Sequence, residues 1–181
     1  MTKNICVYCA SSNRIDSVFF RQAEELGEKL GRSGLHVVNG AGSIGLMRAV
    51  TDGALAAGGT VTGVIPEFMV KRGLCHPHLT RVVQTQTMHE RKKVMADMAD
   101  VFLALPGGFG TFEELLEIIT WRQLRIHNKP VIILNTDGFY NPLLKMFEHA
   151  IATNFIRAEH AQLWEVALSP DDVMALLERF F

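Results

Sequence analysis

The amino-acid sequence predicts an α/β fold, a Rossmann-like three-layer αβα sandwich with a mainly parallel sheet of about seven strands. Short runs rich in Val, Ile and Leu alternate with helical patterns along the whole chain, which is typical of βαβ units. The run "DVFLALPGG" (100–108) is almost continuously apolar, as expected of a strand that is buried on both faces of a parallel sheet. Because there is no linker, repeat or low-complexity tract, we expect residues 1–181 to form a single domain.

The first half of the chain supplies three strands and two helices. Residues 4–11 are rich in Val, Ile and Tyr and end in small polar residues, so they predict a strand. Residues 17–34 have apolar positions at helical spacing and close on a glycine, which is a typical helix stop. A short buried strand is expected at 35–40, followed by a glycine loop and a helix to about residue 57. The run at 60–66 predicts a third strand, which ends at a proline.

The second half continues the alternation. The mixed charges of residues 67–78 favour an irregular loop. After it we expect strands at 79–85, 100–108, 130–135 and 163–168 and helices at 88–99, 111–125 and 140–155. The last helix begins at "SPDD", where serine precedes proline and two acids lie in the first turn.

Composition excludes several classes of function. The 18 basic and 19 acidic residues nearly cancel, which argues against nucleic acid or an anionic membrane as the main partner. No apolar run approaches the roughly 20 residues of a membrane span, and the N-terminal apolar run is too short for a signal peptide. An odd number of cysteines favours a reducing compartment, so we expect a cytoplasmic protein.

Neither cysteine nor histidine spacing indicates a metal site. Cys6 and Cys9 lie three residues apart on a predicted strand and would point to opposite faces. His76 and His78, two apart in a loop, are the best candidates for metal ligands, but no second ligand pair stands at zinc spacing. We therefore expect no metal and no cofactor.

Three loops are expected at the carboxyl ends of strands, where parallel sheets bind ligands. They read "CASSN" (9–13), "GAGSIG" (40–45) and "PGGFGT" (106–111). The second loop matches G-x-G-x-x-G, and Glu67 follows at the spacing of a ribose-binding acid. This pattern follows the second predicted strand instead of the first, and Glu67 comes after a strand-ending proline, so dinucleotide binding is disfavoured.

The stretch "LPGGFGTFEE" (105–114) allows two interpretations of its acids. Free backbone N–H groups of a glycine loop at a helix N-terminus bind phosphate. Thr111 as N-cap with Glu114 three residues later would form a capping box, a purely structural device. Alternatively, Glu114 acts on a group that is attached to the phosphate. The residues alone favour capping for Glu114.

A basic segment precedes this loop. "MHERKK" (88–93) opens the helix upstream of the strand that leads into the glycine loop. Successive helical residues are rotated by about 100°, so at most one or two of its three cations can face the same ligand. A basic helix beside an anion-binding loop makes a charge-matched site, and Lys93 is expected to be solvated.

Together, "MHERK" (88–92) and "PGGFGTFEE" (106–114) resemble the paired M-x-x-R-K and P-G-G-x-G-T-x-x-E signatures of the Lonely Guy (LOG) family. These cytokinin riboside 5′-monophosphate phosphoribohydrolases have also been described as possible lysine decarboxylases. The likeness extends to "CVYCASS", to "GSIGLM" and to "EELLEIITWRQLRIHNKPVIILN", and so covers nearly the whole chain. It implies a Rossmann-like homodimer that cleaves the N-glycosidic bond of a nucleoside 5′-monophosphate, releasing the base and ribose 5-phosphate.

The resemblance also implies roles for individual residues. Arg91 and Glu114 match the catalytic pair. The residues expected on the substrate side are Ser11, Gly42, Met88, Lys92, Gly107, Gly108, Phe109, Gly110, Thr111, Glu113 and Thr120. The chain departs from the family pattern at Ala10, Ala41, Arg48 and Gly73, which leaves the catalytic motif intact and the preferred nucleobase open.

The expected chemistry explains why acids would follow a phosphate loop. Cleavage of a ribosyl C–N bond passes through a state with positive charge on the sugar, which a carboxylate stabilises while it orients or deprotonates water. The phosphate would bind the loop, and Glu114 would face the ribose one turn further on. A guanidinium is a poor proton donor, so we expect Arg91 to act by positioning and electrostatics.

Two alternatives come from other classes of protein. A binding-only protein, such as a molybdenum-cofactor carrier, would use similar glycine loops without hydrolysis and would not need a carboxylate at the sugar. A pyridoxal-phosphate decarboxylase would need a Schiff-base lysine, for which Lys92 and Lys93 are the candidates near the loop. The decarboxylase interpretation gives no role to Arg91 or Glu114.

Overall fold

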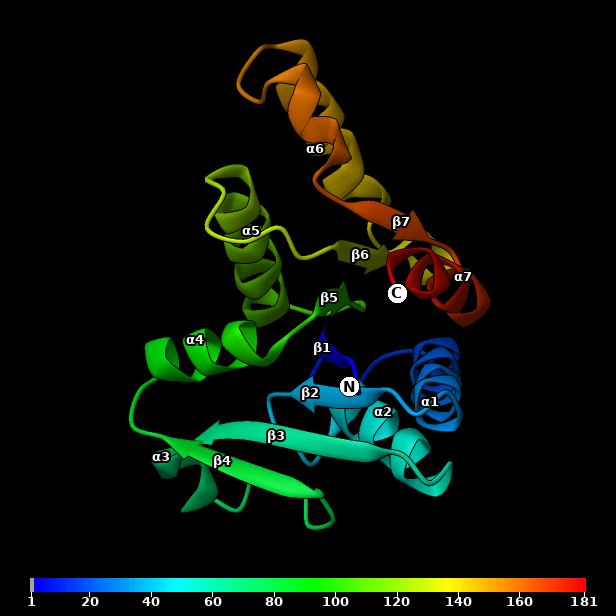
Figure 1. Ribbon diagram of the computed structural model, residues 1–181, viewed down its shortest axis with the longest axis vertical. Coiled ribbons are helices and arrows are strands. Elements are labelled where there is room, and N and C mark those ends of the chain that lie inside the picture. The colour runs from blue at the N-terminus through cyan, green and yellow to red at the C-terminus, as the bar shows by residue number, and fades with distance from the viewer. Residues whose placement is uncertain (1) are drawn as a thin grey trace.

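The computed structural model describes residues 2–181, which fold around one seven-stranded sheet (Figure 1). The strand order is β4-β3-β2-β1-β5-β6-β7, and every neighbouring pair is parallel. The strands are β1 (Asn4–Tyr8), β2 (His36–Asn39), β3 (Thr60–Pro66), β4 (Arg81–Thr85), β5 (Val101–Ala104), β6 (Val131–Leu134) and β7 (Glu165–Ala167). The predicted α/β class and strand number are confirmed.

Helices cover both faces of the sheet. Helices α1 (Ser17–Arg32), α2 (Gly45–Ala56) and α7 (Pro170–Phe180) pack on one face, and α4 (Met88–Met98), α5 (Phe109–Gln123) and α6 (Asn141–Ala152) on the other. Figure 1 shows α4 and α5 on the opposite side of the sheet from α1 and α7. Three short helices complete the chain, namely α3 (Glu67–Val70), η1 (Thr136–Gly138) and η2 (Ala158–Gln162). The result is the predicted three-layer arrangement.

Strand β1 shows how the sheet divides the core. Ile5 and Val7 belong to the apolar cluster beneath α1 and α2, whereas Cys6 and Tyr8 belong to the cluster beneath α4 and α5. The side chains alternate between the faces, as the period of two along a strand requires. All four residues are almost fully buried, because helices cover both faces of the sheet. Cys9 follows on the side of Ile5, so Cys6 and Cys9 lie on opposite faces as predicted.

Several element boundaries differ from the sequence-based expectations. Strand β1 ends at Tyr8 instead of residue 11, and α6 ends at Ala152 instead of residue 155. Three further differences lie near the site. Strand β5 ends at Ala104, so the rest of the apolar run to 108 forms the turn into α5. Helix α5 begins at Phe109, two residues before the expected start, because Gly108 already adopts the extended N-cap conformation. The loop at 67–78 contains the short helix α3 and forms an isolated bridge from Cys75 to Gly42.

Two helix ends form as predicted. Gly34 adopts a left-handed φ of 68° just after α1, where a residue with a side chain would be strained. At α7, the Ser169 hydroxyl accepts a hydrogen bond from the backbone N–H of Asp172, and the Asp172 carboxylate accepts one from the N–H of Ser169. This capping box fixes the start of the last helix.

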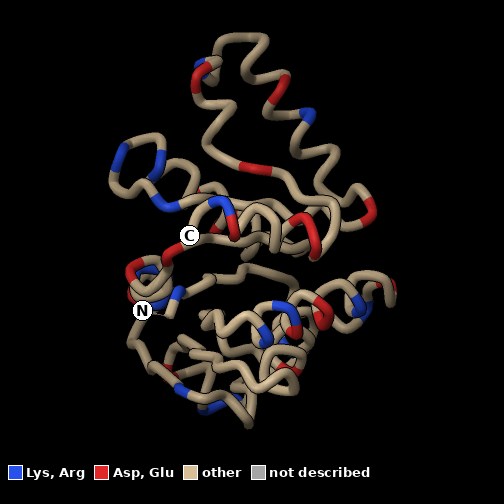
Figure 2. Tube along the Cα trace, turned by 45° about the vertical axis from the view of Figure 1, so that its right-hand side comes forward, with Lys and Arg blue, Asp and Glu red and all other residues tan. Residues whose placement is uncertain are grey.

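Charged residues of both signs occur along the length of the chain (Figure 2). This distribution agrees with the formal net charge of -1. Within residues 2–181, no helix combines the length and the apolar character that crossing a membrane requires.

The contact between α1 and α2 generates the first prediction. Gly27 of α1 lies so close to α2 that a Cβ there would stand 2.3 Å from the carbonyl oxygen of Val50. We expect Gly27→Ala to destabilise the protein by about 1–3 kcal/mol, because the helices must separate. Urea denaturation measures this change in the free energy of unfolding.

The matched control is Glu25→Ala, which removes only a partly exposed ion pair with Lys29 on the same helix. It should change the free energy of unfolding by less than about 0.5 kcal/mol. Helix propensity alone predicts that Gly27→Ala stabilises the fold by up to about 1 kcal/mol, and that outcome would contradict the packing argument.

Candidate functional site

A cavity of about 350 Å³ lies where strand order reverses in the sheet. Strand β1 stands between β2 and β5, and the loops that follow these strands diverge to opposite sides. Such switch points are where open α/β sheets bind ligands. The lining residues are Cys9, Ala10, Ser11, Gly40, Gly42, Ser43, Ile44, Met47, Met69, Leu74, Arg91, Gly108, Phe109, Gly110, Thr111 and Glu114. The three loops predicted from the sequence therefore meet at one cavity.

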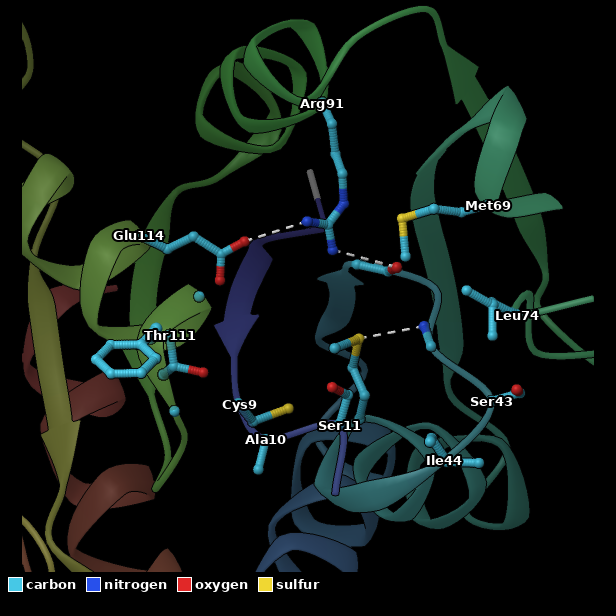
Figure 3. Close-up of a pocket in the computed structure, with 16 residues that line it drawn as sticks. Cys9, Ala10, Ser11, Ser43, Ile44, Met69, Leu74, Arg91, Thr111 and Glu114 are labelled. Carbon is cyan, nitrogen blue, oxygen red and sulfur yellow. Dashed lines mark hydrogen bonds and ion pairs between the residues drawn. The ribbon is translucent and has the colours of Figure 1, made fainter. Parts of the chain in front are cut away.

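Arg91 enters the cavity from the first half of α4 (Figure 3). Its side chain is 8% exposed. Its Nε donates a hydrogen bond to the Val64 carbonyl at 3.0 Å, and its Nη2 donates to the Gly40 carbonyl at 3.3 Å. A Cβ on residue 40 would stand 1.7 Å from Nη2, so only glycine leaves room for the guanidinium. Carbonyls of β3 and of the residue that follows β2 thus fix the guanidinium group.

Glu114 faces Arg91 from α5, and Figure 3 shows the two side chains pointing toward each other. The Arg91 Nη1 lies 3.4 Å from the Glu114 Oε1, and the carboxylate side chain is 11% exposed. Burial raises the pKa of Glu114 from its ordinary value of 4.5 to about 7, and the charge of Arg91 only partly opposes this shift. A buried carboxyl with a pKa near 7 can accept and release a proton at neutral pH.

The N-terminus of α5 forms the adjacent wall. Gly108 is the N-cap and provides no side-chain hydrogen bond, so Phe109, Gly110 and Thr111 are the first three helical residues. Their N–H groups have no acceptor within the helix, and all three residues line the cavity. Phe109 is 92% exposed, which leaves this wall open. The helix therefore presents free donors and the positive end of its dipole to the cavity.

The capping-box interpretation of "TFEE" is wrong. Thr111 lies inside α5 and is buried, so it cannot serve as the N-cap. Glu114 is consequently the sixth residue of the helix, beyond the positions that reach back to a cap. Its carboxylate is therefore available to the cavity.

The opposite wall is formed by the loop after β2 and the segment after β3. The Gly42 N–H lies 3.1 Å from the Met47 sulfur, and the Ser43 N–H donates to the Leu74 carbonyl at 3.0 Å. Ala41, one of the departures from the family pattern, adopts a left-handed φ of 62°. This conformation explains why a glycine suits position 41, since other residues are strained there.

The predicted site residues divide into two groups. Those that line the cavity are Ser11, Gly42, Arg91, Gly108, Phe109, Gly110, Thr111 and Glu114. Those that do not are Met88, Lys92, Gly107, Glu113 and Thr120. Sequence reasoning missed the apolar wall made by Ile44, Met47, Met69 and Leu74. Ile44 and Met47 lie in or just after the glycine loop and could have been found, whereas Met69 and Leu74 belong to no motif.

The residues outside the lining have other contacts. Lys92 forms ion pairs with Glu113 and Glu117 of α5. The Thr120 hydroxyl donates to the carbonyl oxygen four residues before it, within the same helix. Met88 is the first residue of α4 and is partly exposed. Gly107 lies against Thr111, whose hydroxyl would stand 2.1 Å from a Cβ at position 107.

The two loop histidines have partners within the protein. His76 is buried, and its Nε2 lies 3.0 Å from the Asp52 carboxylate. Its Nδ1 accepts a hydrogen bond from the backbone N–H of His78 at 3.2 Å. Across residues 2–181, no three His, Cys, Asp or Glu side chains are grouped so that they could hold a metal ion.

Fold and cavity together define a Rossmann-like α/β protein with a nucleotide-sized site at the switch point of its sheet. A family model described as "possible lysine decarboxylase" matches residues 47–177. The chain is 42% identical to a rice protein named cytokinin riboside 5′-monophosphate phosphoribohydrolase LOG, covering 98% of this chain and 74% of that protein. It is 39% identical to LOG2 of Arabidopsis thaliana, which bears the same enzyme name, and the match covers 98% of this chain and 84% of that protein. The chain belongs to the LOG family.

Solved structures show the same architecture at greater sequence distance. The molybdenum cofactor carrier protein of Chlamydomonas reinhardtii is 22% identical with a TM-score of 0.77, covering 99% of this chain and 98% of that one. The molybdenum cofactor binding protein of Rippkaea orientalis is 23% identical with a TM-score of 0.75, and the match covers 99% of this chain and 97% of that one. These likenesses concern the fold.

The raised pKa of Glu114 predicts how stability depends on pH. The folded protein holds this proton up to about pH 7, whereas the unfolded chain releases it near 4.5. The contribution of Glu114 to stability therefore falls as pH rises through this window, by up to about 3 kcal/mol. Glu114→Gln removes this titration, so the stability difference between wild type and variant should change by this amount.

Urea denaturation of both proteins at pH 5 and pH 8 measures that difference. Because other titrating groups are shared, they largely cancel in the comparison. If the stability difference is the same at both pH values, the buried environment assigned to Glu114 is wrong.

Proposed function

We propose that this chain hydrolyses the N-glycosidic bond of an adenine-type nucleoside 5′-monophosphate. The products are the free base and ribose 5-phosphate, and the substrate is a cytokinin riboside 5′-monophosphate, AMP or both. The names of the relatives, at about 40% identity over nearly the whole chain, support this activity. Residues 1–181 would act as one cytoplasmic hydrolase domain that needs neither metal nor cofactor.

The single observation that carries the proposal is the buried pair of Arg91 and Glu114 beside a free helix N-terminus. The substrate phosphate would bind the N–H groups of Phe109, Gly110 and Thr111, because backbone donors and the helix dipole favour an anion. Glu114 lies five residues after Phe109, which is roughly 7.5 Å further along the helix axis. A nucleotide likewise holds its phosphate and its anomeric carbon several ångströms apart, and the Glu114 side chain reaches back toward the start of the helix.

In this orientation the ribose faces Glu114. Positive charge develops on the sugar as the bond to the base breaks, and the carboxylate stabilises it. A water molecule adds to the anomeric carbon and gives its proton to Glu114, whose pKa of about 7 suits a general base. The departing base takes up a proton from solvent and Glu114 afterwards returns its own proton to solvent, so the sum is nucleotide plus water giving base plus ribose 5-phosphate.

Arg91 would position the carboxylate and balance its charge. Its hydrogen bonds to the carbonyls of Val64 and Gly40 hold the guanidinium against movement. Its charge keeps part of the Glu114 population ionised in a site whose burial favours the neutral acid. The apolar wall of Ile44, Met69 and Leu74 lies across the cavity and would contact the base.

A homodimer is part of the proposal. Apolar side chains on the outer faces of α4 and α5 and on the loop after α5 are exposed and would suit contact with a second copy. They are Met88, Leu116, Leu124 and Ile126, at 41%, 41%, 61% and 64% exposed.

The direct test is incubation with AMP and with N6-isopentenyl AMP, followed by chromatography for the free base. We expect release of base from at least one of them by the wild type. Glu114→Gln should reduce kcat by at least about 100-fold, because it keeps the shape but removes the charge. Nucleotide binding, measured by calorimetry, should remain within a few-fold.

Lys93→Met is the matched control, since Lys93 pairs with Asp97 on the exposed side of α4. It should retain the wild-type rate. Tight nucleotide binding without release of base from either compound would favour a carrier. Near-full activity of Glu114→Gln would overturn the role given to Glu114.

The pH dependence of the reaction follows from the ionisation of Glu114. The carboxylate is the active form, so kcat/KM should fall tenfold per unit below about pH 7 and level off above it. The substrate phosphate titrates near pH 6, about one unit lower. Titration of the Glu114 carboxyl by carbon NMR separates the ionisation of the enzyme from that of the substrate phosphate. If the fall in kcat/KM at acid pH were centred near pH 4.5, it would contradict the assignment.

A further inference from the structure

Two neighbouring cations of α4 face three carboxylates of α5. Arg91 pairs with Glu114 at the cavity, whereas Lys92 pairs with Glu113 and Glu117 outside its lining. Glu113 and Glu117 are four residues apart and lie on one face of α5, so a single ammonium group can bind both. The helices are therefore joined by two adjacent sets of ion pairs.

We propose that Lys92, Glu113 and Glu117 form a clasp that positions Glu114 and sets the charge around it, so that Lys92 is a positioning residue and not a substrate ligand. The proposal rests on the proposed function for the role of Glu114 in hydrolysis. It reassigns Lys92 and Glu113, which the sequence placed on the substrate side.

Burial of Lys92 is the first argument. Its side chain is only 9% exposed, and a buried ammonium group requires partners. Both partners come from α5, where Glu117 accepts at 3.1 Å and Glu113 makes the second contact. Burial lowers the pKa of Lys92, but the two carboxylates more than compensate and leave it raised. The amine is thus a fixed cation that is already committed to α5.

Sequence adjacency is the second argument. Arg91 and Lys92 are consecutive on α4, and Glu113 and Glu114 are consecutive on α5. A shift of α5 relative to α4 would therefore break both sets of pairs together. Holding Glu113 and Glu117 keeps the first two turns of α5 in place, and these turns carry Glu114.

The charges near Glu114 are the third argument. Arg91 and Lys92 favour its ionised form, whereas Glu113 and Glu117 oppose it. Cys6 and Tyr8 of β1, and Cys9 after it, also lie near Glu114, but burial raises the pKa of each of these groups and keeps them neutral at pH 7. The state of the clasp therefore sets the net charge that Glu114 experiences.

The test compares three variants by their kcat/KM against pH. Lys92→Met leaves two carboxylates without a counter-charge, so the acid limb should move up by roughly half a unit to one unit. The double variant Glu113→Gln, Glu117→Gln leaves the cation, so the limb should move down by a similar amount. Combining all three substitutions should return the limb to within about 0.3 unit of the wild type.

A substrate ligand would behave differently. If Lys92 bound the phosphate, Lys92→Met would raise KM at every pH in addition to any shift of the acid limb, and the triple variant would keep this raised KM. That pattern, or limbs that move in the same direction in the two variants, would overturn the clasp. Lys93→Met serves again as the control and should leave the limb unchanged.

Failure of the proposed function can be told apart from failure of the clasp. Carbon NMR titration of Glu114 in the same variants measures its pKa without any turnover. If the wild type released no base, opposite shifts of this pKa would still support the clasp. If Lys92→Met did not fold, the double variant would decide, because glutamine oxygens can still accept hydrogen bonds from Lys92.

Discussion

The ion pair between Arg91 and Glu114 is the interaction on which the rest of the site depends. It joins α4 to α5 in a buried position, where Arg91 also donates hydrogen bonds to the carbonyls of Val64 in β3 and of Gly40 after β2. Removing two charges from water is costly, and the pKa of about 7 shows that burial of Glu114 outweighs the attraction of Arg91. A better-packed apolar pair would serve stability alone at least as well. A catalytic role for the carboxylate would explain why the protein tolerates this cost. The pair also requires glycine at position 40, because a Cβ there would collide with the Arg91 guanidinium.

Much of this structure could be predicted from local pattern. The alternation of strands and helices, the opposite faces of Cys6 and Cys9 and the capping box at Ser169 all follow from periodicity and short motifs, which act within a few residues. The start of α5 could not, because Thr111 is as good an N-cap as Gly108 by residue type, and the tight turn after β5 decides between them. Met69 reaches the cavity only because its segment folds back onto the glycine loop. That contact joins segments that are far apart in the sequence, and periodicity within one segment cannot predict it.

The fold by itself does not define the chemistry. Proteins named as molybdenum cofactor carriers share the architecture at 22–23% identity, whereas enzymes named as phosphoribohydrolases are about 40% identical over nearly the same length. A Rossmann-like sheet supplies a crevice and free helix N-termini to many functions. What the site adds is a carboxylate one turn inside a helix whose first N–H groups line the same cavity. This polarity, negative ligand at one end and developing positive charge at the other, matches a nucleotide that is cut at its glycosidic bond.

The orientation of the nucleotide is the central claim, and a crystal structure of Glu114→Gln with bound AMP tests it most directly. The account predicts that the phosphate accepts hydrogen bonds from the backbone N–H groups of Phe109, Gly110 and Thr111. It also predicts that the anomeric carbon lies within about 4 Å of the residue 114 side chain, as a near-attack geometry requires. A phosphate bound at Arg91, with the ribose directed away from residue 114, would contradict the account.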